Sequence, residues 1–227
     1  MGLFDTSITE LLARVIVLFT AITVHEFAHG FVAYKLGDPT AKYAGRLTLN
    51  PISHLDPIGA ICMVLFRFGW AKPVPVNPMY FKNRKRDNAL VALAGPLSNI
   101  LLAFVSLIFV AFYSKLGYVE IHGGNLYYLF ENSVAEFGFI LLCQLAMLNI
   151  SFAIFNLIPF PPLDGSKILA VFLSQRNYAK FLIYEHLCFP ILILLSLTGV
   201  LGKILGFFIV PVMDLWMICL EGLINII

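Results

Sequence analysis

Five long apolar segments, separated by shorter polar ones, place the strongest constraint on what this chain can fold into. They cover about residues 11–36, 88–114, 137–157, 181–201 and 205–223. A helix needs about 20 apolar residues to cross the hydrocarbon core of a bilayer, because each residue adds about 1.5 Å of rise. The pattern therefore predicts an all-α polytopic membrane protein with about five transmembrane helices.

Composition agrees with a membrane protein. Hydrophobic residues make up 60% of the 227 positions and charged residues 12%, whereas soluble domains carry roughly 25% charged residues. The net charge is only +2 and the one basic run is 82–86, so we expect the lipid bilayer as a partner and no nucleic acid. The N-terminus has no basic region ahead of its apolar run and does not resemble a cleaved signal peptide.

The region between the first and second spans is expected to be irregular. Residues 58–70 are apolar but too short to span, which predicts a re-entrant or interfacial segment. The alternation in 46–49 predicts a short strand. Pro73 and Pro75 remove N–H donors from one edge of 70–78, so that segment is expected to be an edge strand or an irregular extended piece.

Charge predicts the orientation. Residues 72–86 and 167–180 are basic, whereas 115–136 contains three glutamates and one lysine. Because basic loops stay in the cytoplasm, we expect 115–136 and the N-terminus to lie outside the cell. The last two apolar segments could instead pack as a tilted hairpin.

The first apolar segment contains His25-Glu26-Phe27-Ala28-His29, a His-Glu-x-x-His motif. On a helix, His25 and His29 share one face and can bind one divalent metal ion, and Glu26 can reach a water on that ion. A lone histidine in a membrane helix is usually a packing residue. Two histidines that bracket an acid at membrane depth instead indicate a functional site.

A catalytic zinc site typically has three protein ligands, so one more is needed. The acidic candidates in or near the apolar segments are Asp164, Glu185, Asp214 and Glu221. Asp164 is preferred, because three prolines break the preceding helix end and Gly165 permits a sharp turn. Such broken backbone is tolerated at depth only where it is buried in protein or lines a cavity. His54 and Asp56 are interpreted as turn residues rather than as a second metal site.

Three motifs in this order resemble the site-2 protease family of intramembrane zinc metalloproteases, peptidase family M50. They are the His25–His29 motif, Gly95-Pro96-Leu97-Ser98-Asn99, and Asn156-x-x-Pro159-x-Pro161-x-x-Asp164-Gly165. The stretch from 37 to 57 is similar to the compact bacterial and archaeal subgroup that lacks PDZ and CBS domains. The resemblance covers about residues 20–170.

This resemblance implies one zinc ion per chain, bound by His25, His29 and Asp164. Glu26 would be the general base and Asn156 a hydrogen-bond donor near the substrate. The expected organisation is a single membrane protease domain over 1–227, with a catalytic core at about 11–170 and C-terminal helices at about 181–223. It would cleave transmembrane proteins near the cytoplasmic side of a prokaryotic plasma membrane.

Two other functions remain open from the sequence. A non-proteolytic zinc-binding adaptor would have no need of Glu26. A metal transporter would have ligands staggered across the bilayer, whereas these are expected at one depth.

Overall fold

The computed structural model describes residues 8–66, 69–122, 125–130, 133–174, 177 and 185–226. Its helices and strands are, in order, α1 (Ile8–Lys35), α2 (Thr40–Tyr43), η2 (Pro51–Ser53), α3 (Pro57–Phe66), η3 (Pro78–Tyr80), α4 (Arg84–Lys115), β1 (Val119–His122), β2 (Asn125–Tyr128), α5 (Ser133–Leu157), α6 (Asp164–Leu169), α8 (Glu185–Leu197) and α9 (Val200–Ile226). The prediction of an all-α polytopic membrane protein is confirmed.

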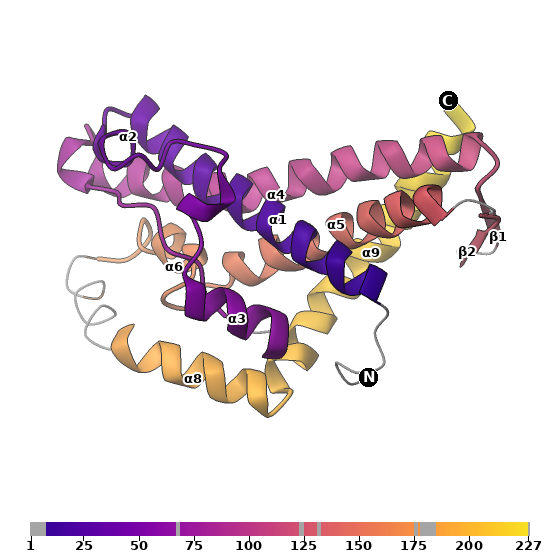
Figure 1. Cartoon of the computed structure of the whole chain (residues 1–227). Coiled ribbons are helices and arrows are strands. Elements are labelled where there is room, and N and C mark those ends of the chain that lie inside the picture. Colours follow the sequence, from indigo (N-terminus) through magenta and orange to yellow (C-terminus); the bar gives the residue numbers. More distant parts are fainter. Residues whose placement is uncertain are drawn as a thin grey trace.

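Three long helices form the centre of the molecule. α1, α4 and α5 each contact the other two, and they run side by side along the length of the protein (Figure 1). Within the described residues, these three and α9 are the helices long and apolar enough to cross a membrane. The predicted spans at 11–36, 88–114, 137–157 and 205–223 therefore each correspond to one helix.

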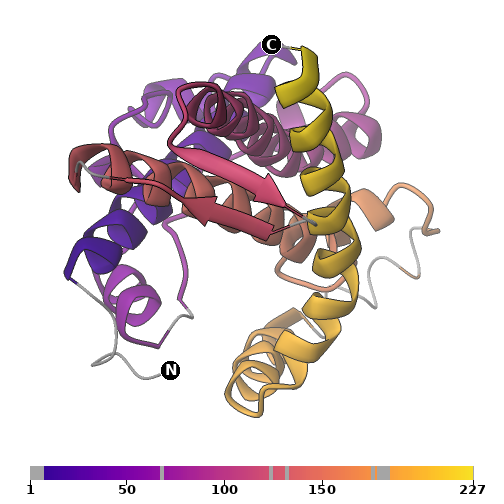
Figure 2. The ribbon, with the colours of Figure 1, turned by 90° about the vertical axis from the view of Figure 1, so that its right-hand side faces the viewer.

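One end of this bundle is closed by apolar packing. Leu107 on α4, Phe139 on α5 and Leu220 on α9 are almost fully buried in one cluster, which also includes Val119 of β1. The antiparallel hairpin of β1 and β2 lies at this end, and α9 packs along α4 and α5 beside it (Figure 2). The cluster holds the helices together where no candidate site residue lies.

The predicted span at 181–201 is only partly described, and its described part does not form a full span. α8 has 13 residues and ends before a turn at Gly199, whose φ is +73°. At 1.5 Å per residue such a helix measures about 20 Å, short of the roughly 30 Å hydrocarbon core. α8 and α9 contact each other, so the hairpin alternative fits the described residues better than two separate spans.

The segment between α1 and α4 is irregular, as expected, but residues 46–49 do not form the predicted strand. Burial does not follow the alternation here, because Leu49 is exposed and Arg46 is buried in a loop, where its guanidinium donates a hydrogen bond to the carbonyl of Lys72. α3 is a 10-residue apolar helix, too short to span. Residues 72–77 are extended without belonging to a sheet.

The proline-rich end of α5 returns the chain toward α1. Here Gly165 permits a close contact, because a Cβ on it would lie 2.3 Å from the carbonyl oxygen of Leu157 and 2.4 Å from that of Ile158. α6 can therefore begin directly against the last turn of α5, with Asp164 as its first residue. α6 also packs against α4.

Candidate metal centre

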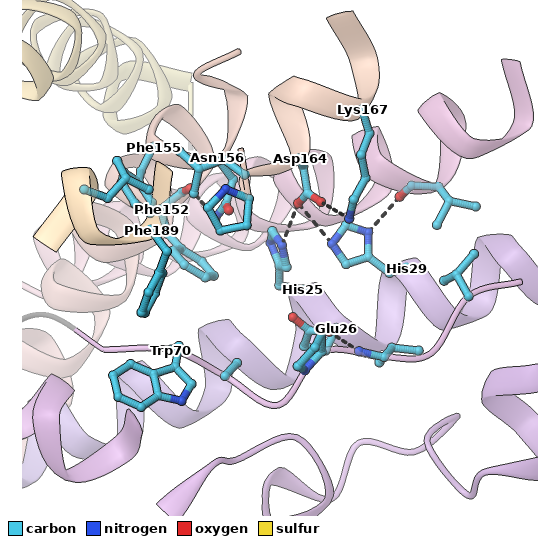
Figure 3. Close-up of a pocket in the computed structure, with 18 of the residues that line it drawn as sticks. His25, Glu26, His29, Trp70, Phe152, Phe155, Asn156, Asp164, Lys167 and Phe189 are labelled. Carbon is cyan, nitrogen blue, oxygen red and sulfur yellow. Dashed lines mark hydrogen bonds and ion pairs between the residues drawn. The ribbon is translucent and has the colours of Figure 1, made fainter. Parts of the chain in front are cut away.

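His25, His29 and Asp164 converge at one buried point between α1 and α6. Oδ2 of Asp164 lies 3.1 Å from Nε2 of His25 and 3.1 Å from Nε2 of His29. All three residues are less than 10% exposed, and Figure 3 shows the two rings pointing toward the carboxylate from the same helix. The structure thus brings together the three residues that the sequence pattern selected as metal ligands.

A hydrogen bond at Nδ1 fixes the orientation of each imidazole ring. Nδ1 of His29 lies 2.7 Å from the carbonyl oxygen of Val91 on α4, and Nδ1 of His25 lies 2.5 Å from Oδ1 of Asn99 on the same helix. A carbonyl can only accept, so Nδ1 of His29 must donate. The same reasoning for His25 depends on the orientation of the Asn99 amide. Second partners of this kind commonly orient metal-binding histidines.

The donor set fits a divalent metal ion. With each Nδ1–H donating, both Nε2 atoms direct lone pairs at a carboxylate oxygen, an arrangement that needs a cation among the three groups. Two imidazole nitrogens and one carboxylate form a usual ligand set for catalytic zinc.

Gly95 gives the histidines room against α4. A Cβ on Gly95 would lie 2.5 Å from Cε1 of His29 and 2.6 Å from Cε1 and Nε2 of His25. Asn99 follows one helical turn later on the same face, where it meets Nδ1 of His25. In the Gly95–Asn99 motif, the first residue thus leaves space for both histidine rings and the last makes a hydrogen bond with one of them.

Glu26 lies on the side of His25 opposite Asp164 in the view of Figure 3. Its Oε2 accepts a hydrogen bond of 2.9 Å from the backbone N–H of Val74 in the extended segment. The N–H of Lys72 is also engaged, with the carbonyl of His54. The edge that Pro73 and Pro75 leave available is therefore already partly paired within the protein.

A cleft of about 440 Å³ opens beside the three converging residues. Its walls are mostly apolar, and its aromatic members are Trp70, Phe152, Phe155 and Phe189. Asn156 lines it from α5 and is 8% exposed, and one of its amide N–H groups donates to the carbonyl of Phe152. Asn156 therefore lines the same cleft as Glu26.

Several lining residues were not identified from the sequence. Lys167 lies one turn after Asp164, and its Nζ is 3.3 Å from Oδ1 of that carboxylate. Trp70 contacts Phe189 with ring centroids 5.8 Å apart, so α8 completes the cleft although no motif beyond residue 170 indicated this. Only the i, i+3 spacing of Asp164 and Lys167 gave a signal that sequence reasoning could have used.

The remaining acidic and histidine candidates stay outside the centre. Asp214 and Glu221 are exposed on α9, and the side chain of Glu185 lies outside the described residues. Nε2 of His54 lies 2.8 Å from the carbonyl of Thr48, and Asp56 accepts from the N–H of Gly59 at the start of α3. The interpretation of His54 and Asp56 as turn residues agrees with these contacts.

Several known proteins are similar in sequence to this chain. Residues 13–198 match the sequence model described as "Peptidase family M50". The chain is 40% identical over 184 residues to "Putative zinc metalloprotease YwhC" of Bacillus subtilis, covering 81% of this chain and 80% of that protein. It is also 26% identical over 189 residues to Rip2 of Mycolicibacterium smegmatis, which has the same description, covering 81% of this chain and 66% of that protein. No solved structure matches.

The membrane helices, the donor set and these relatives define a class, the membrane metalloproteases. Within that class, the chain belongs to peptidase family M50.

Proposed function

We propose that this protein is a site-2-protease-like intramembrane zinc endopeptidase that cleaves transmembrane proteins near the cytoplasmic face of a prokaryotic plasma membrane. One observation carries the proposal. His25, His29 and Asp164 bring three ligand atoms within 4.8 Å of one another, in a cleft beside Glu26 and between helices long enough to cross a bilayer. The chemistry would reside in residues 11–170, with α8 and α9 as flanking helices of the same domain.

His25, His29 and Asp164 would hold one zinc ion per chain. Zinc in such a site supplies a Lewis acid that can lower the pKa of a coordinated water to about 7 and polarise a peptide carbonyl. Lys167 bonds Oδ1 of Asp164, so it would leave Oδ2, the oxygen nearest both histidines, for the metal. The protein's contribution is thus a fixed set of three donors with an open side toward the cleft.

Glu26 would accept the proton of the attacking water and pass it to the leaving amine. To do so, its carboxylate must be free to face the cleft, so the hydrogen bond from Val74 would be exchanged or shared through its second oxygen. Asn156 would donate its second amide N–H to the carbonyl oxygen of the substrate, a role suited to a group that stays neutral.

The substrate must be partly unwound where it is cut. A helix engages its peptide groups in i→i−4 hydrogen bonds, so attack requires a stretch with small or helix-breaking residues. The apolar walls of the cleft, with Trp70 and Phe155 among them, suit side chains from a membrane-spanning segment.

The proposed orientation follows from the positions of charge. His29 precedes Lys35 at the end of α1 by six residues and His25 by ten, which corresponds to roughly 9–15 Å below that interface. Lys85 at the start of α4 bonds the carbonyl of Leu173 just beyond α6. Basic residues thus gather at the end of the bundle nearest the site, as the positive-inside rule expects for the cytoplasm.

The decisive experiment is the substitution Glu26→Gln in the full chain, reconstituted in liposomes with a single-span substrate that contains a glycine-rich stretch. Glu26→Gln should keep zinc content at one per chain but lower the cleavage rate by on the order of 10³-fold, because general acid–base groups contribute about 10²–10⁴-fold. Glu136→Gln, the same chemical change at the exposed start of α5, should leave both quantities unchanged.

Undiminished cleavage by Glu26→Gln would remove the proposed mechanism. Zinc binding without cleavage by the wild-type protein would favour the adaptor. Flux of zinc into sealed liposomes that stops in Asp164→Ala would favour the transporter, although the described residues contain a single metal-ligating group, at one depth.

A further inference from the structure

A network of buried amide groups connects His25 on α1 to Asn149 on α5. Oδ1 of Asn99 is 2.5 Å from Nδ1 of His25, and Nδ2 of Asn99 donates to Oδ1 of Asn149 at 2.6 Å and to the carbonyl of Ala21 at 3.2 Å. Nδ2 of Asn149 in turn donates to the carbonyl of Leu145 at 2.7 Å. This hydrogen-bond network therefore links α1, α4 and α5, the three helices at the centre of the fold.

The backbone carbonyls at the two ends of this network determine the direction of every hydrogen bond in it. The carbonyls of Ala21 and Leu145 can only accept, so each asparagine must direct its amino group toward its carbonyl. Asn149 then presents its oxygen to Asn99, and Asn99 presents its oxygen to His25. His25 must donate from Nδ1, which leaves the lone pair of Nε2 for the metal ion.

Burial makes any other orientation of these amide groups unfavourable. Asn99 and Asn149 are both 0% exposed and His25 is 3% exposed, within helices that cross the membrane. Rotation of either amide by 180° would place donor against donor and acceptor against acceptor among fully buried groups. Polar groups in such an interior are costly when unpaired.

We propose that Asn149, acting through Asn99, is a positioning residue that fixes the tautomer of His25 and thereby selects Nε2 as the metal-binding atom. This inference rests on the proposed function, because it concerns the metal of the same site. Asn149 belongs to none of the three sequence motifs. It lies two helical turns before Asn156 on α5. The same face of this helix therefore places Asn156 in the cleft and Asn149 against Asn99, the partner of His25.

The two histidines are held in different ways. Nδ1 of His29 meets the backbone carbonyl of Val91, which no side-chain substitution can remove. Nδ1 of His25 depends on two side chains in series. Zinc binding should therefore be sensitive to Asn99 and Asn149, and this sensitivity should pass through His25 alone.

The experiment measures zinc affinity by competition with a chromophoric chelator, using the full chain in detergent at fixed pH. Outer hydrogen-bond partners of metal ligands typically contribute about 10–100-fold to affinity, so Asn99→Ala should weaken zinc binding by that factor and Asn149→Ala by about 10-fold. The double variant should bind no more weakly than Asn99→Ala, because Asn149 acts only through Asn99.

Ser106→Ala is the matched control. Ser106 is also buried on α4, but its hydroxyl donates to the carbonyl of Leu102 in the same helix and not to the site, so zinc affinity should not change. If Asn149→Ala does not fold, Asn149→Ser tests the same point, since its shorter side chain cannot reach Asn99.

Equal zinc affinity in wild type and Asn149→Ala would overturn the inference, as would losses that simply add in the double variant. Either result would leave the proposed function intact provided that the wild-type protein binds zinc and cleaves. Failure of the wild-type protein to do so would instead overturn the proposed function.

Discussion

The two ends of the helix bundle bury different kinds of side chains, although α4 and α5 contribute to both. At the end with β1 and β2 the buried cluster is apolar, with Leu107, Phe139 and Leu220 among its members. At the other end the buried side chains include His25 and Asp164. The apolar cluster and the proposed metal centre thus lie at different halves of the same helices. Substitutions in one half should change the free energy of unfolding, and substitutions in the other should change zinc binding and cleavage.

The largest effect is expected at the third ligand. Asp164→Asn replaces the carboxylate with a neutral amide that binds zinc poorly, so zinc content and cleavage should fall together, the rate by on the order of 10⁴-fold. Metal analysis and cleavage in liposomes measure the two. Asp214→Asn, an identical change on the exposed face of α9, should alter neither, and a large effect there would contradict the comparison.

A smaller loss is expected when the helix spacing at the site is changed. Gly95→Ala places a Cβ where the rings of His25 and His29 lie, so the rings must shift. A displacement of about 1 Å at a reacting centre can lower the rate roughly 10²-fold. Gly206→Ala, where a Cβ would meet nothing within 4 Å, is the control. Normal cleavage by Gly95→Ala would show that cleavage does not depend on the close approach of α4 to the rings of His25 and His29.

The smallest effect on cleavage is expected from the apolar end. Leu107→Ala removes a side chain that is 1% exposed and should lower the free energy of unfolding by about 2–5 kcal/mol, while the cleavage rate per folded molecule stays unchanged. Unfolding by denaturant in detergent measures the first quantity. Leu101→Ala, on a 63% exposed position of the same helix, is the control. A fall in the rate per folded molecule would couple the two ends.

The sequence predicted the parts of this structure that depend on local spacing. His25 and His29 are neighbours on any helix because they are four residues apart, and long apolar runs identify spans. Asp164 was found because three prolines end a helix in an unusual way. These inferences needed no knowledge of how the helices pack.

What the sequence did not predict depends on packing. Asn149 looks like any polar residue in a span until α4 is placed beside it, and nothing in the sequence shows that Val74 reaches Glu26. The predicted strand at 46–49 was wrong because a long-range hydrogen bond from Arg46 to the carbonyl of Lys72 buries the polar residue in a loop and leaves Leu49 exposed. Hydropathy alone also did not predict the turn at Gly199, which follows α8.

The split of the centre along the chain has a consequence for biosynthesis. His25 and Asp164 are 139 residues apart, and α4 and α5 are made between them. A nascent chain that has inserted only α1 carries both histidines and Glu26, yet it lacks Asp164, the proposed third ligand, and the Asn99 and Asn149 amides. Under the proposed function, hydrolytic capacity would therefore arise only after most of the chain has been synthesised and inserted.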